Sequence, residues 1–510
     1  MSAATILPRF IGDRVGLRDR RQNPLYILTT CSQSRPMNDD IPEETPQRFT
    51  RSLSGFGVII LTLSVLSPGV SIFVSGASIL HQAGTGAVLA FVIGSFVCYC
   101  ATSMAAELGA AYPTAGYDCA ALGHAIGDWA GGTSYIATIV GFPLFLNTSA
   151  IGIASYLHPF GLPFSDNAIT FAMIGLITLL SLLNIRSNEG ITGLFMAIEV
   201  VALLLVAGVG AWHAQPGAAA MILHPVHMQA GMIVATGIAI VGIATNNAAW
   251  SLAGSSQALF FSEDMKRPET IGRIIMLSFA ITVVLETAPI IGTIIGSRDL
   301  HAVLATEAPF EVFLTQHLPD FTLKLVSAAI AIAIFNACLA GFIGIGRNVF
   351  AMGRTRLFAP PINHALTRLI GRTQAPWVAI LLISISTALA TYLPLYIKIL
   401  LLSGNTTILI AFQVAGVWRG RRRGLTGVHS YRTPLFPLIP ALGVLIFVGE
   451  VVVLWIDADA GRKSLFICAA IWAGAFLYYH LGLMRRPGGW VMRGPDDVDA
   501  EVARAVPSSA

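Results

Sequence analysis

The stretch LSVLSPGVSIF, residues 63–73, places Pro68 and Gly69 in the middle of an apolar segment. Proline removes a backbone donor and clashes with the preceding turn of a helix, and glycine costs a helix interior about 1 kcal/mol relative to alanine. In hydrocarbon every backbone polar group needs a partner, so unwound backbone persists there only where it is buried or lines a cavity. The stretch therefore predicts a membrane helix that is either kinked or interrupted at a functional site.

The composition places the chain in a membrane. Of its 510 residues, 55% are hydrophobic and only 11% are charged, whereas soluble proteins carry about 25% charged residues. With so few charges, most of the surface must face lipid rather than water. We expect a polytopic membrane protein whose partner is the lipid bilayer. The net charge of +4 gives no indication of nucleic-acid binding.

The two ends of the chain differ from the rest. Residues 1–50 are polar and rich in arginine, and they contain no apolar stretch of the secretory-signal type. We expect a disordered cytoplasmic tail there, with Met37 as a second plausible translation start. Residues 51–485 are predicted to form the membrane domain, and residues 486–510 a second cytoplasmic tail.

Twelve segments are long and apolar enough to cross a bilayer, which takes about 20 residues. They run approximately over 55–80, 87–111, 131–157, 167–185, 190–212, 231–262, 273–296, 321–350, 377–393, 396–418, 436–456 and 464–484. The predicted fold is therefore all-α. Most loop arginines, including the run RGRRRG at 419–424, fall on one side if both termini are cytoplasmic. The positive-inside rule thus predicts this orientation in the inner membrane.

The sixth segment is interrupted as well. Its stretch ATNNAAWSLAGSSQALFF, residues 244–261, carries asparagines, serines and a glycine where a plain span would be aliphatic. Segments one and six are each the first of five if residues 55–212 and 231–418 are two repeats, followed by two extra helices at about 436–484. Paired breaks at equivalent positions are typical of transporters built from inverted repeats.

The chemistry of such breaks indicates a ligand. A half-helix starting near Val70 presents free N–H groups and a positive dipole end, which suit a carboxylate. Half-helices ending near Leu66 and Leu252 present free carbonyls, which suit an ammonium group or another cation. Together the two ends describe an α-amino acid bound near the middle of the membrane.

Four stretches also carry a family resemblance. They are AAELGAAYPTAGY (105–117), SEDMKRPETIGRI (262–274), FIGIGRNVFAMGRTRLFAP (342–360) and YRTPLFPLIPALG (431–443). In this order the chain resembles the amino acid–polyamine–organocation transporter superfamily over roughly residues 50–485. The resemblance implies a five-plus-five inverted repeat with broken helices one and six, two extra helices, and secondary transport of amino acids or amines by alternating access.

By position, the resemblance assigns the substrate contacts to the two breaks. The matching residues are Ser67, Pro68, Gly69, Val70 and Ser71 in the first, and Ser251, Ala253, Gly254 and Ser255 in the sixth helix. The first break is poorer in glycine than is common in the superfamily. Ser255 stands where many members place an aromatic gate, which implies a roomier or more polar pocket.

Two carboxylates in the middle of predicted spans are candidates for proton coupling. A charged side chain at this depth costs about 2.5–3.5 kcal/mol on insertion scales, and burial favours the neutral form of the carboxyl group. Glu199 is the first candidate as proton carrier, with a structural hydrogen bond as the alternative. Glu286 is the second, and it could instead face an ammonium group or another helix.

Other polar residues within the spans have simpler interpretations. Asn147 and Asn336 are expected to make helix–helix hydrogen bonds, and Glu107 to pair with backbone or a loop arginine. Glu263 and Asp264, next to Lys266 and Arg267, are expected to form a solvated salt network or a gate latch.

The motifs that the sequence contains and lacks restrict the possible functions of the protein. No HExxH, GxSxG or P-loop motif is present, so the chain is not expected to be an enzyme. Cysteines without CxxC spacing, and His224 and His227 in one loop, indicate no metal site, and no organic cofactor is expected. Transport of amino acids is favoured, with protons as coupling ion ahead of exchange and sodium. The alternative is an amine or polyamine importer or exchanger, in which Glu199 and Glu286 would bind the cationic groups.

Overall fold

The computed structural model describes residues 49, 51–157, 163–183, 185–319, 321–428, 430–456, 461–486 and 490–492. Nearly all of the predicted first tail lies outside these residues. Of the predicted second tail, Trp490 and Met492 are buried: the Trp490 Nε1–H donates to the Thr355 carbonyl at 2.7 Å, and the Met492 N–H donates to Asp128 Oδ1 at 3.0 Å. This part of the predicted tail packs on the helices.

The fold is mostly helical. The longer helices are α4 (Ala87–Ala111), α7 (Gly141–Leu157), α8 (Asp166–Ser181), α9 (Ile185–Trp212), α12 (Ile271–Gly296), α15 (Phe321–Arg354), α18 (Leu395–Arg422), α19 (Leu438–Ile456) and α20 (Gly461–Tyr478). The shorter ones are α1 (Gly55–Leu66), α2 (Pro68–Val70), α3 (Ala77–Ala83), α5 (Tyr117–Ile126), α6 (Asp128–Ile139), α10 (Ala218–Leu223), α11 (Ile238–Ser251), α13 (Leu300–Leu304), α14 (Pro309–Thr315), α16 (Pro360–Leu366) and α17 (Trp377–Leu389).

Several of these helices can cross a membrane. Within the described residues, seven segments are long and apolar enough: Gly55–Ala111, Asp128–Ile153, Ser187–Trp212, Pro268–Gly296, Ala328–Arg354, Leu438–Ile456 and Gly461–Leu483. Two shorter apolar helical segments, Asp166–Ser181 and Trp377–Tyr392, fall where the sequence predicts spans. The protein is thus a multi-pass membrane protein, while the count of twelve spans stays a prediction.

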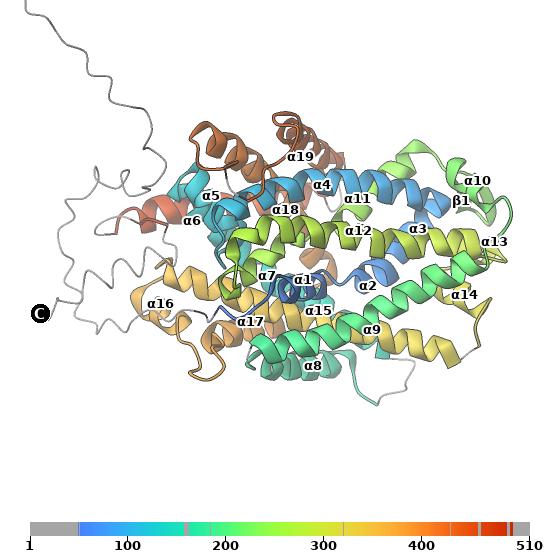
Figure 1. Ribbon diagram of the computed structural model, residues 1–510, viewed down its shortest axis with the longest axis horizontal. Helices are drawn as coiled ribbons and strands as arrows, with labels where there is room; N and C mark the ends of the chain where they lie inside the picture. The colour runs from blue at the N-terminus through green and yellow to red at the C-terminus, as the bar shows by residue number, and fades with distance from the viewer. Residues whose placement is uncertain are drawn as a thin grey trace, which may run out of the picture. The chain divides into compact units, whose positions relative to one another are not determined.

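The helices pack closely where small residues meet. A Cβ on Gly210 of α9 would lie 2.1 Å from the Gly292 carbonyl oxygen of α12, so only glycine permits this crossing. Small residues at helix crossings are common in membranes because packing, rather than water exclusion, drives association there. Figure 1 shows α1 and α2 among the long helices α4, α9, α12 and α15, and α1 contacts α9, α12 and α15.

One element departs from the all-α prediction. β1 (Val226–Gln229) and β2 (Met232–Ala235) form an antiparallel hairpin. β1 lies in the predicted loop between the fifth and sixth spans, but β2 occupies the start of the predicted sixth span, 231–262, and α11 begins only at Ile238. Its two turn residues, Ala230 and Gly231, have φ of 49° and 80°, as tight hairpin turns require. Short alternating patterns of this kind are hard to distinguish from a loop between two long apolar segments.

Candidate functional site

The first helix is broken at Ser67. α1 ends at Leu66, Ser67 adopts the left-handed conformation with φ 48° and ψ 78°, and Pro68 begins the next helical segment. Proline is favoured in this first position because its missing N–H has no helical partner there. The second segment continues through a π-helical stretch, Ser71–Gly76, into α3. The break is therefore a single residue, and the new segment starts at Pro68 rather than near Val70 as predicted.

The second break follows α11. This helix ends at Ser251, Gly254 has φ 126°, and residues Ser255–Asp264 form a 3₁₀ helix. Only glycine adopts such a φ without strain. Because runs of 3₁₀ helix beyond three or four residues are uncommon, ten residues of it mark an unusual segment. Both predicted interruptions are present in the structure.

A carboxylate occupies the start of the segment after the first break. Glu199 Oε1 of α9 accepts hydrogen bonds from the Gly69 backbone N–H at 2.6 Å and from the Ser67 hydroxyl at 3.0 Å. The Glu199 side chain is buried, with 1% of its surface exposed. The helix start favours negative charge there. The sequence analysis expected a substrate carboxylate in this position, so the structure shows the protein's own carboxylate where a ligand group had been predicted.

A second carboxylate lies at the other break. Glu286 Oε2 of α12 accepts a hydrogen bond from the Ser251 hydroxyl at 2.9 Å, and Glu286 is fully buried. The Ser251 carbonyl in turn accepts a hydrogen bond from the Ser71 hydroxyl at 3.1 Å. Ser71 and Ser251 thereby join the two broken helices directly, and Glu286 is attached to this junction.

Polar atoms with spare hydrogen-bonding capacity gather at these residues. Among the described residues, Glu199 Oε2, Glu286 Oε1, Ser255 Oγ and both amide atoms of Asn336 have no hydrogen-bond partner, and all four side chains are buried. An unsatisfied buried polar group costs about 1–3 kcal/mol. These atoms offer hydrogen-bonding capacity to a polar ligand or a proton.

The two predicted asparagine contacts differ in outcome. Asn147 makes the expected helix–helix bonds: its amide donates to the Thr387 carbonyl at 2.9 Å and its Oδ1 accepts from buried Lys398 at 2.5 Å. Asn336 of α15 interacts with Glu199 of α9, which is a contact between two helices as predicted, although its amide atoms make no hydrogen bond of good geometry.

The nine predicted contact residues are not equally placed. Ser67 and Gly69 contact Glu199, while Ser71 and Ser251 bond each other. A Cβ on Gly254 would lie 3.1 Å from the Leu66 side chain. Pro68 and Ser255 are buried, Val70 is partly buried and Ala253 is exposed. Glu199 and Glu286, predicted from their depth alone, turn out to contact the first and the second break respectively.

One end of the bundle is held by buried ion pairs. Arg347 Nε donates to Asp264 Oδ2 at 2.6 Å, and Arg354 binds both Glu263 oxygens at 2.6 Å. The network expected with Lys266 and Arg267 is thus neither solvated nor centred on those residues, because Glu263 and Asp264 turn toward arginines of α15. The expectation for Glu107 is confirmed, since it accepts from Arg421 Nε at 2.8 Å and from the Thr433 N–H at 2.8 Å.

The segment before α1 adds to this end. The Leu53 N–H donates to the Asp264 carbonyl at 2.8 Å, and the Leu53 carbonyl accepts from the Lys266 N–H at 3.0 Å. Leu53 is fully buried. The chain entering the first broken helix is therefore fixed to the end of the second one.

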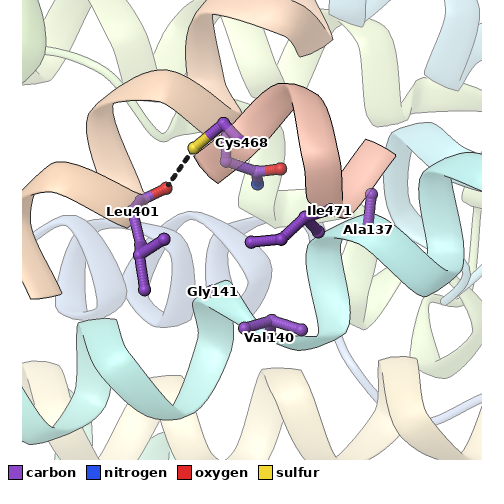
Figure 2. Close-up of a pocket in the computed structure, with 7 residues that line it drawn as sticks. Ala137, Val140, Gly141, Leu401, Cys468 and Ile471 are labelled. Carbon is purple, nitrogen blue, oxygen red and sulfur yellow. Dashed lines mark hydrogen bonds between the residues drawn. The ribbon is translucent and has the colours of Figure 1, made fainter. Parts of the chain in front are cut away.

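A small pocket lies away from the breaks. Figure 2 shows it between α6, α7, α18 and α20, lined by Ala137, Val140, Gly141, Leu401, Asn405, Cys468 and Ile471. Cys468 Sγ donates to the Leu401 carbonyl at 3.5 Å, and Asn405 Oδ1 accepts from Trp472. Its lining is mostly apolar, so we assign it no binding role. In the part of the chain that the structure describes, no three His, Cys, Asp or Glu residues are grouped to hold a metal ion.

Comparison with known proteins indicates that the chain is a transporter. Residues 53–476 match the protein family described as amino acid permease. An uncharacterized transporter of Mycobacterium tuberculosis is 24% identical over 327 residues, covering 63% of this chain and 69% of the relative. The amino-acid permease RocC of Bacillus subtilis is 23% identical over 82% of this chain and 92% of its own. The branched-chain amino acid permease BcaP of Lactococcus lactis is 24% identical over 85% and 93% respectively.

Proposed function

Because the chain belongs to the amino acid permease family, we propose that it transports α-amino acids across the cell membrane by alternating access. The family and the similar proteins are transporters, not enzymes, and they act on small molecules in a membrane. The observation that carries the proposal is the junction of the two broken helices through Ser71 and Ser251, with a buried carboxylate at each break.

The substrate groups have matching positions at this junction. The ammonium group binds at the carboxyl end of α11, where the Ser251 carbonyl and the free oxygen of Glu286 provide negative charge. The substrate carboxylate binds at the Gly69 N–H, at the start of the segment after the first break. No metal or organic cofactor takes part in this proposal.

The coupling ion in the proposal is a proton. Glu199 is the carrier, because its carboxylate lies at the substrate position and can become neutral when a proton binds. Glu286 is the second candidate. Both termini are cytoplasmic and twelve helices, arranged as two inverted repeats of five plus two, span the inner membrane. The ion pairs of Asp264 and Glu263 and the Leu53 contact then form the inner gate.

A second candidate function is favoured by one specific observation. The Gly69 N–H is already bonded to Glu199 at 2.6 Å, so a substrate without a carboxylate could bind at Glu286 without displacing anything. This arrangement suits an amine or polyamine, which lacks a carboxylate and needs acidic contacts. An amino acid remains our first choice of substrate, because its ammonium group and its carboxylate then each have a partner at the site.

Uptake into proteoliposomes tests the proposal. Purified protein would be assayed with labelled amino acids and with their decarboxylated amines, under an imposed pH gradient or sodium gradient. Gly69→Trp and Gly254→Trp should abolish uptake, while Gly175→Trp, at a position with open space around it, should transport normally. Normal uptake by both site variants would rule out the proposed site, and uptake of amines alone would establish the second candidate.

A further inference from the structure

We infer that Glu199 is a tethered substitute for the substrate's carboxylate, and that the two carboxylates alternate on the Gly69 N–H. The inference rests on the proposed transport of amino acids. In this mechanism the proton and the substrate are linked because a proton must neutralise Glu199 before it yields its place.

The geometry gives room for only one carboxylate. Glu199 Oε1 lies 2.6 Å from the Gly69 nitrogen, and even a Cβ added to Gly69 would come within 2.8 Å of Glu199 Cγ. A substrate carboxylate at the same N–H would meet a like charge in a buried site, where repulsion is strong. Binding of the substrate therefore requires Glu199 to lose its charge and move.

A neutral Glu199 has new partners beside it. Its O–H needs an acceptor, and the Oδ1 of neighbouring Asn336 has no partner among the described residues. The Ala333 carbonyl, 3.3 Å from the Ser67 hydroxyl, is a second acceptor close by. The charges balance: one proton adds to Glu199, one carboxylate leaves the Gly69 N–H, and the substrate carboxylate replaces it.

Among the charged groups around the Gly69 N–H, Glu199 is the one whose protonation can change there. α9 packs against α1, α2, α12 and α15. Described residues of α1 and α2 include no titratable side chain. α12 contributes Glu286, which stays attached to Ser251, together with Arg273 at its first turn, far along the helix from Glu286. On the described part of α15, Arg347 and Arg354 are paired with Asp264 and Glu263. On α9 itself, Glu189 lies against Gly57.

Two ligand classes should then respond oppositely to pH. An amino acid competes with ionised Glu199, so its affinity should rise by at least about tenfold between about pH 8 and about pH 5.5. A decarboxylated amine makes no use of the Gly69 N–H and loses attraction as carboxylates become protonated. Its affinity should stay level or fall over the same interval.

Calorimetry on the purified full-length protein can separate these cases. Leucine with isopentylamine and arginine with agmatine serve as probe pairs, at both pH values and in buffers of different ionisation enthalpy. At about pH 8, amino acid binding to the wild type should take up about one proton, whereas amine binding should take up none and can release protons. Glu199→Gln should bind the amino acid without this proton uptake and with little pH dependence. Glu450→Gln, at a partly buried glutamate of α19, is the matched control and should behave as wild type.

Each outcome of these binding measurements either supports or overturns the inference about Glu199. Proton uptake that persists in Glu199→Gln, or amino acid binding to the wild type without proton uptake, overturns it while leaving amino acid transport intact. Should Glu199→Gln not fold, Glu199→Asp, whose shorter side chain reaches Gly69 less well, must show weaker pH dependence. If neither member of either pair binds or is transported by the wild type at any pH, the proposed function fails and the inference with it.

Discussion

Glu199 of α9 accepts a hydrogen bond of 2.6 Å from the backbone N–H of Gly69, across a sequence separation of 130 residues. This bond ties the fifth predicted span to the break in the first. It places a negative charge at the start of a helical segment, where charge and backbone dipole attract each other. The break is thus held by a long-range contact and not only by the local preferences of Pro68 and Gly69.

Replacing Gly69 with alanine should disturb this contact directly. Gly69 lies in a helical turn, so alanine suits the backbone, but its Cβ would lie 2.8 Å from Glu199 Cγ and 3.0 Å from Oε1. Overpacking of this kind costs about 1–3 kcal/mol of stability, and we expect uptake to fall about tenfold or more. Thermal unfolding and proteoliposome uptake measure the two effects.

A control and a double variant make this test specific. Gly208→Ala changes the same residue type at a position of α9 with open space, and it should leave uptake and stability unchanged. Adding Glu199→Asp to Gly69→Ala shortens the clashing side chain and should recover part of the stability. Strictly additive losses in the double variant would show that the two residues do not interact.

Neutralising Glu286 should weaken binding of the ammonium group. Glu286→Gln keeps an oxygen for the Ser251 hydroxyl but removes the charge, and charged hydrogen bonds are about twice as strong as neutral ones. We expect KM for uptake to rise about tenfold, corresponding to about 1.4 kcal/mol, with a smaller change in the maximal rate. Concentration-dependent uptake gives both values. A change in maximal rate alone would assign Glu286 to conformational coupling rather than to binding.

The sequence predicts both breaks because their cause is local. Proline and glycine alter the backbone wherever they stand, so Pro68 and Gly254 locate the interruptions to within a few residues. The same reasoning cannot show that Glu199 fills the position offered to a ligand, since that depends on how α9 packs against α2. A mid-span carboxylate signals importance but does not name its partner.

Other differences between the predictions and the structure also depend on packing between helices, which the sequence does not specify. Hydropathy predicts spans at 167–185 and 377–393, and apolar helical segments lie there, Asp166–Ser181 and Trp377–Tyr392, although each has fewer than the about 20 residues that a span usually takes. Asn336 is polar and buried as expected, yet its contact depends on a neighbouring helix whose rotation the sequence does not specify. Likewise, Glu263 and Asp264 bond to arginines more than 80 residues away, while the sequence analysis considered only adjacent charges.

The ion pair of Arg347 with Asp264 offers a stability test. Both side chains are buried and 2.6 Å apart. Removing one partner of a buried pair leaves an uncompensated charge and costs about 3–5 kcal/mol, so Arg347→Met should lower the unfolding temperature clearly. The double variant Arg347→Met with Asp264→Leu should regain most of the loss. Arg372→Met, at an exposed arginine, is the control, and an equal loss there would argue against a specific role for the pair.

Asp118 should make the protein's stability depend on pH. Its carboxyl group is buried in α5, outside the predicted spans, and burial raises its pKa from the ordinary value to about 7, despite a hydrogen bond from Gln413 at 2.8 Å. A raised pKa means that the folded state favours the protonated form. Stability from this group is therefore complete below the unfolded pKa of about 4 and is lost as pH rises through about 7.

Asp118→Asn removes this titration while keeping a neutral polar side chain. Its amide can donate to Gln413 Oε1, which has no partner among the described residues. The variant should be more stable than wild type at about pH 8, by at most about 4 kcal/mol, and nearly equal to it at about pH 4. Thermal unfolding in detergent across this range measures the difference, with exposed Glu269→Gln as control. A stability difference that does not grow with pH would show that Asp118 is ionised in the folded protein, and its burial would then require a cationic partner.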